Sequence, residues 1–162
     1  MTKQDFSRLF LAGAVATLVM AGILYTAPFI GMPKMDMAAM LGWIFQGFTA
    51  EPRTGAWWAG MAFYLVNGSV VLPLIFSAFF ASHLPGPAWL KGTIWGLILW
   101  AMLELVVMPL MDVGVFSRRA LQPGMLDAVN FAGHVVYGVL FGALAGNIAM
   151  HIGLPSHRER HV

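Results

Sequence analysis

The sequence predicts an all-α membrane protein with four transmembrane helices. Of its 162 residues, 59% are hydrophobic and 10% are charged, whereas a soluble domain carries about 25% charged residues. The mean hydropathy is +0.77. Apolar stretches lie at about residues 7–30, 56–80, 92–111 and 130–151, and a transmembrane helix needs roughly 20 such residues. No linker is long enough for a second domain, so we expect one transmembrane four-helix domain over residues 1–162.

The first stretch has the basic start of a signal peptide, with Lys3 and Arg8 before an apolar run. The run of about 22 residues is longer than the 7 to 15 residues of a signal core. We therefore interpret it as a retained first helix.

The distribution of Lys and Arg predicts the orientation. The side with both termini and the second loop carries Lys3, Arg8, Lys91, Arg158 and Arg160, and the other side carries Lys34, Arg53, Arg118 and Arg119. Five against four favours cytoplasmic termini in the inner (cytoplasmic) membrane. The few charges form no basic patch, so nucleic acid is not an expected partner. Because cysteine is absent, disulfides, thiolate metal sites and covalent c-type haem are excluded.

A short pattern occurs twice, as MPKMD at 32–36 and MPLMD at 108–112. The residues of the pattern are Met32, Pro33, Met35 and Asp36 in the first copy and Met108, Pro109, Met111 and Asp112 in the second. The even-numbered helices also match, because GSVVLPLIFSA from Gly68 aligns without gaps on GHVVYGVLFGA from Gly133. These matches predict an internal duplication of a two-helix hairpin, giving two parallel repeats.

In each copy the proline ends a regular helix, and the aspartate is suited to cap the next segment of the chain. After Asp36, the segment MAAMLGWIF predicts a short interfacial helix. After Asp112, the segment VGVFS predicts a loop or a single turn.

Two cofactors are alternatives to a packing role. Met32, Met35, Met37 and Met40 form a thioether cluster, and thioethers select Cu(I), but methionine also fills gaps between packed helices. Haem b needs two facing imidazoles; His134 has no histidine partner at its depth, whereas His83 and His151 lie near the opposite membrane face and could in principle pair. We favour packing and expect no cofactor.

Polar residues inside the spans are the best candidates for a site, because such residues are costly in lipid. Glu104 and His134 lie roughly 10 Å and 6 Å deep, on the same side of consecutive helices, which predicts a contact between them. Tyr137 shares the helix face of His134, and Tyr64 and Asn67 enter from the other hairpin. The pair is either structural, as an interhelical hydrogen bond, or a site for a proton, ion or ligand.

Gly138, Gly142 and Gly146 recur at four-residue spacing on the fourth helix. Such a ridge lets another backbone approach closely. The partner is either a helix of the same chain, or a second copy or another membrane protein.

Four segments, GMPKMD, LPGPAWLKG, VMPLMDVGVFS and GHVVYGVLFGALAG, occur in this order. With them the chain resembles a family of small four-helix membrane proteins known as a domain of unknown function. The resemblance implies the fold and the membrane location, and it implies no activity. It highlights Met35, Asp36, Met108, Asp112, Gly133, His134, Tyr137 and Gly138, whereas Met37 and Met40 lie outside the pattern.

No nucleophile elbow, phosphate loop or paired catalytic carboxylates appear in the sequence. We expect a non-enzymatic accessory or scaffold subunit in the lipid bilayer, with a membrane-protein partner or a second copy. The alternative is a small protein that handles an ion, a proton, copper or haem at Glu104 and His134. A third hypothesis is an enzyme acting on a lipid or quinone, with His134 as the base.

Overall fold

The computed structural model describes residues 2–146. Predictions that concern residues 147–162, including that for His151, lie outside this part of the chain. The described chain is all-helical and contains four helices long and apolar enough to cross a membrane, plus a shorter helix. This confirms the predicted fold class. The four candidate spans are Lys3–Ile30, Gly55–Phe80, Ala88–Leu110 and Pro123–Ala145.

Several spans combine more than one helical type. The first span consists of α1 (Lys3–Thr26) and the 3₁₀ turn η1 (Ala27–Ile30). The second consists of α3 (Gly55–Val66), the π-helical η2 (Asn67–Val71), α4 (Leu72–Ile75) and the π-helical η3 (Phe76–Phe80). The third consists of α5 (Ala88–Met102), the π-helical η4 (Leu103–Val107) and α6 (Met108–Leu110), and the fourth is α7 (Pro123–Ala145). The connecting elements are α2 (Met37–Gln46) and the 3₁₀ turn η5 (Val115–Ser117).

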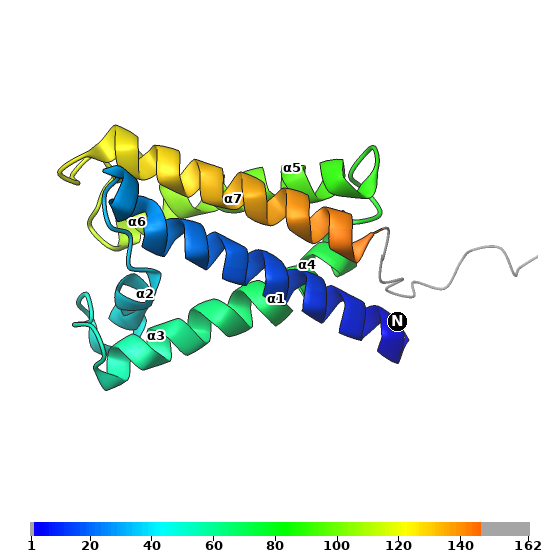
Figure 1. Ribbon diagram of the computed structural model, residues 1–162, viewed down its shortest axis with the longest axis horizontal. Helices are drawn as coiled ribbons and strands as arrows, with labels where there is room; N and C mark the ends of the chain where they lie inside the picture. Colours follow the sequence, from blue (N-terminus) through cyan, green and yellow to red (C-terminus); the bar gives the residue numbers. More distant parts are fainter. Residues whose placement is uncertain (1, 147–162) are drawn as a thin grey trace, which may run out of the picture.

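The spans follow one long axis, with α1 between α7 and α3 (Figure 1). α5 packs along α7, α1 packs along α7 and on η2, and α2 packs on α3. Within residues 2–146, α3 and α5 do not pack along each other. The two halves of the chain therefore meet mainly through α1 and α7.

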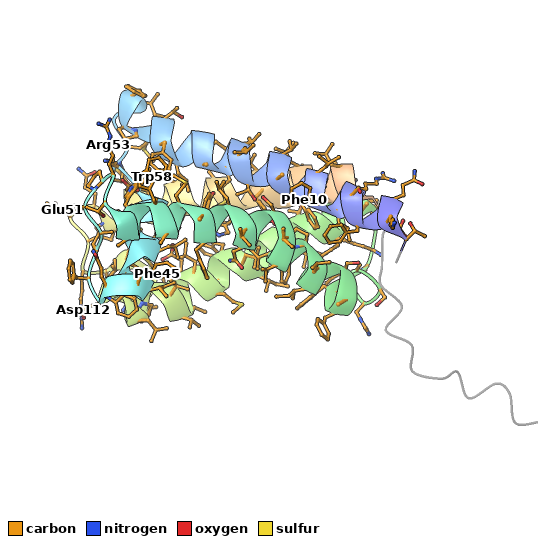
Figure 2. The ribbon with its side chains drawn as sticks, turned by 90° about the horizontal axis from the view of Figure 1, so that it is seen from below. Phe10, Phe45, Glu51, Arg53, Trp58 and Asp112 are labelled. Atoms are coloured by element: carbon orange, nitrogen blue, oxygen red, sulfur yellow. The ribbon has the colours of Figure 1, made fainter. Side chains whose placement is uncertain are left out.

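Polar and apolar side chains are separated along this axis. Glu51, Arg53 and Asp112 lie together at one end, in the loops between spans, whereas Phe10 lies on the flank of the bundle (Figure 2). Phe10 and Trp58 are exposed although both are large and apolar. An apolar flank between polar loops is the surface that a lipid bilayer requires.

The glycine ridge is used inside the chain. A Cβ atom at Gly138 would lie 2.4 Å from the carbonyl oxygen of Gly92, and one at Gly142 would lie 2.3 Å from that of Ala88. These contacts show that α5 and α7 approach at backbone distance, as the small-residue pattern predicted. Gly146 does not belong to the ridge, because it follows the end of α7 with φ of 70° and faces the Arg8 guanidinium.

The fourth helix begins earlier than predicted. The sequence placed its start at about residue 130, whereas α7 starts at Pro123. Proline is favoured in the first helical turn because its missing N–H would have no helical partner there. As a result, Asn130 lies two turns inside the helix and is fully buried.

The π-helical stretches η2 and η4 each end two residues before a proline. Within the second span, the Leu72 N–H donates to the carbonyl of Asn67, and Pro73 has no N–H to offer. The carbonyl of Gly68 is thereby left without a partner from its own helix, and the Tyr137 hydroxyl donates to it at 2.9 Å. Pro109 follows η4 in the same way. Such π segments are frequent at functional sites.

Asp36 organises the first copy of the repeated motif. Its Oδ1 atom accepts hydrogen bonds from the Ala39 N–H at 3.0 Å, the Tyr25 hydroxyl at 2.7 Å and the Trp57 indole N–H at 3.0 Å. It therefore caps α2, as predicted, and also joins α1 to α3. Burial raises the pKa of Asp36, but these hydrogen bonds and the nearby Lys34 ammonium lower it more, so the net pKa lies below its ordinary value.

The second copy has a different structure, which corrects the prediction of a second cap. Asp112 is exposed, has a φ of 62°, and pairs with Arg119. The turn η5 begins after Gly114 and has no side-chain cap. Pro109 lies within α6, whereas Pro33 lies in the loop before α2. The sequence repeat therefore does not specify the same local structure twice.

Candidate functional site

A cavity of about 430 Å³ lies between the third span and the second. Its lining residues on α5 and η4 extend from Trp95 to Val107, which is roughly 18 Å at 1.5 Å per residue. The apolar lining consists of Met20, Met37, Leu41, Leu72, Ile75, Phe80, Ile98, Leu99, Met102, Leu103 and Val107. The volume is within the range of about 300–1,000 Å³ typical of small-molecule sites.

Six polar side chains also line this cavity: Thr17, Tyr64, Asn67, Trp95, His134 and Tyr137. The structure thus brings together four of the five predicted intramembrane polar residues. Glu104 is the exception, because it is fully buried and does not line the cavity.

Three of the polar side chains already donate hydrogen bonds to backbone carbonyls. The Thr17 hydroxyl donates to Gly13 at 2.7 Å, and the Tyr137 hydroxyl donates to Gly68 at 2.9 Å. The Tyr64 hydroxyl donates more weakly to the carbonyl of Thr17, at 3.4 Å. Each of these groups fixes its own position and keeps only acceptor lone pairs for the cavity.

Trp95 and Asn67 retain unused donors. The indole N–H of Trp95 is buried and has no hydrogen-bond partner among the described residues, although Trp95 packs against Phe76 and Phe80. The Asn67 side chain, at the start of η2, likewise has no hydrogen bond within residues 2–146. The Trp95 N–H has no accessible surface, whereas the half-buried Asn67 amide lines the cavity and can donate to a ligand there.

His134 has a defined orientation. Its Nδ1 atom lies 2.8 Å from the carbonyl oxygen of Asn130, one turn earlier on α7. A carbonyl can only accept, so Nδ1 carries the proton and the Nε2 atom of the neutral ring is an acceptor. His134 is 8% exposed and Nε2 has no partner among the described residues, so the acceptor edge is available to the cavity.

Glu104 belongs to a separate buried cluster. It accepts from the Asn130 side-chain amide at 3.0 Å and from the Ser117 hydroxyl at 3.3 Å. Asp127, one turn before Asn130 on α7, also interacts electrostatically with Glu104. The predicted contact with His134 is therefore wrong: among the described residues, Glu104 interacts with the side chains of Asn130, Ser117 and Asp127 instead. The cluster joins the third span, η5 and α7.

Asn130 connects the cluster to the cavity. Its side chain is held by Glu104, and its backbone carbonyl holds the His134 ring. Sequence reasoning missed Asn130 because the fourth helix was predicted to begin there. Pro123 was the signal that could have moved the start of the helix and placed Asn130 inside it.

The remaining predicted residues have packing positions. Met35 and Met108 are in the core, as is Met37, while Met32 and Met40 pack against it. Met111 is half-buried near the end of the third span. Among the described residues, no three histidine or acidic side chains lie close enough together to hold a metal ion.

Comparison with known proteins gives the family of this chain. No curated protein and no solved structure matches it. The family of unknown function DUF6789 matches residues 4–154, which is nearly the whole chain. The chain therefore belongs to the DUF6789 family, a family of unknown function.

Proposed function

We propose that this protein is a multi-pass membrane protein that binds an uncharged lipid in the cavity between its second and third spans. The observation that carries the proposal is the cavity itself, which is elongated, mainly apolar, and lined by six polar side chains that include His134 and Asn67. Sites for small apolar ligands combine these features.

The ligand is uncharged because the cavity offers no counter-ion. Of the lining residues, all within residues 2–146, none is Lys, Arg, Asp or Glu. Moving a charged head group into such a place is costly. An acyl or prenyl chain would fill the apolar length, and its head group would lie near His134 and Asn67.

Binding requires no catalytic step, in keeping with the expectation of a non-enzymatic protein. An accessory role in a complex is compatible with lipid binding, but the glycine ridge does not support it, because α5 covers Gly138 and Gly142. Proton handling at Glu104 and His134 is less well supported, since the two side chains belong to different hydrogen-bond groups.

The test is native mass spectrometry of the protein purified gently from its membrane. A Leu99→Trp variant places a larger side chain in the cavity, and Leu97→Trp is the matched control, because Leu97 is exposed and does not line it. We expect a bound lipid on the wild type and on Leu97→Trp, and none on Leu99→Trp. Equal lipid on all three would overturn the proposal, as would a lipid-free protein in a fixed ratio with a partner protein.

A further inference from the structure

The polar groups of the cavity differ in whether they can donate hydrogen bonds to a ligand or accept them from it. The His134 Nε2 atom can only accept, because the opposite nitrogen donates to Asn130. The Asn67 side-chain amide, which has no hydrogen bond to another described residue, can donate through its N–H groups. A well-matched head group therefore both donates and accepts.

This requirement separates the classes of uncharged lipid. An ester, ketone or ether oxygen accepts only, and would leave Nε2 of His134 unpaired in apolar surroundings. A hydrocarbon would leave both groups unpaired. A hydroxyl group has one donor and two lone pairs, and so it can satisfy His134 while accepting an N–H.

The rest of the polar lining is consistent with a single small head group. The hydroxyls of Tyr64 and Tyr137 already donate to backbone carbonyls, so neither can supply a proton to a carbonyl-bearing ligand. Asn67 belongs to the opposite hairpin from His134 and has a free amide. His134 and Asn67 thus contribute available polar groups from two different hairpins to an otherwise mainly apolar space.

We propose that the ligand is a lipid alcohol whose hydroxyl donates a hydrogen bond to Nε2 of His134, with its hydrocarbon chain in the apolar part of the cavity. This inference rests on the proposed function, because it names the ligand class for the same cavity. It also makes His134 the residue that selects the head group.

The experiment measures saturable binding of tritiated dodecanol to the full-length protein in detergent micelles. Unlabelled dodecanol, dodecyl methyl ether and dodecane compete, so the chain stays the same while the hydroxyl donor is removed. One hydrogen bond is worth about a tenfold difference in affinity. We expect the ether and the alkane to compete about tenfold more weakly than the alcohol on the wild type.

A His134→Phe variant keeps a ring at this position and removes the acceptor. On this variant we expect the alcohol and the ether to compete equally. A tenfold preference for the alcohol that remains on this variant would mean that the hydroxyl donates to another group, and would overturn the inference. If the variant does not fold, the wild-type comparison still decides, because equal competition by alcohol and ether refutes hydroxyl recognition.

The two proposals fail in different ways. Equal competition by all three ligands, with saturable binding, refutes the lipid-alcohol inference and leaves lipid binding in the cavity intact. An absence of any saturable binding refutes the proposed function itself.

Discussion

Substitution of Gly138 by alanine is the strongest test of the helix packing. The new Cβ atom would lie 2.4 Å from the carbonyl oxygen of Gly92 and 3.1 Å from the Cα atom of Gly96. A close carbon–oxygen contact is normally about 3.4 Å, so α5 and α7 would have to separate by roughly 1 Å. Both opposing groups are backbone, so no rotamer change can relieve the clash. Overpacking of this kind costs about 1–3 kcal/mol.

The control for this substitution is Gly22→Ala on α1. A Cβ atom at Gly22 has no neighbour within 4 Å, so this variant has the gain in helix propensity from glycine to alanine, about 0.5–1 kcal/mol, without a clash. The free energy of unfolding is measured by circular dichroism during titration of mixed micelles with SDS. If Gly138→Ala is as stable in this titration as Gly22→Ala, the close approach of α5 and α7 is wrong.

Three further predictions concern the polar groups. Trp57→Phe removes the indole N–H bonded to Asp36 and should lower the free energy of unfolding by about 1 kcal/mol. Trp58→Phe, at an exposed position, should lower it by less than about 0.5 kcal/mol. Equal losses of stability in the SDS titration would contradict the role of Asp36. Because the folded pKa of Asp36 is lowered, its contribution to stability is present above its unfolded pKa of about 3.9 and is lost as the pH falls through the folded value. Asp36→Asn should therefore weaken the acid dependence of unfolding, and an unchanged pH profile would count against this linkage. Glu104→Leu leaves the buried Asn130 amide unpaired and should destabilise the protein by about 1–3 kcal/mol. Glu104→Gln keeps an acceptor and should destabilise the protein less. A Glu104→Gln protein that is less stable than Glu104→Leu in the SDS titration would argue against the cluster.

The sequence predicted the spans because hydrophobic length is a local property that the bilayer imposes. It also predicted α2 and its cap, since Asp36 immediately precedes the helix. The same reasoning failed for Asp112, where the chain adopts a left-handed backbone conformation and the side chain pairs with Arg119. Local motifs specify a cap only when a helix comes directly after them.

The site was less predictable because it depends on how distant segments pack. Depth along the spans placed Glu104 near His134, but depth does not give the direction of a side chain around its helix axis. The donor that reaches Glu104 is Asn130, one turn away from His134 on the same helix. The cavity also has no local signal, since it arises where α5 and α3 do not pack together.

The central claim is that a lipid occupies the cavity beside Trp95. A dodecanol brominated along its chain quenches tryptophan fluorescence on contact, so quenching reports the position of the bound chain. We predict a saturable component of quenching that is lost in Trp95→Phe and retained in Trp58→Phe, because Trp58 is exposed and does not line the cavity. Saturable quenching that survives unchanged in Trp95→Phe, or none in the wild type, would contradict lipid binding in this cavity.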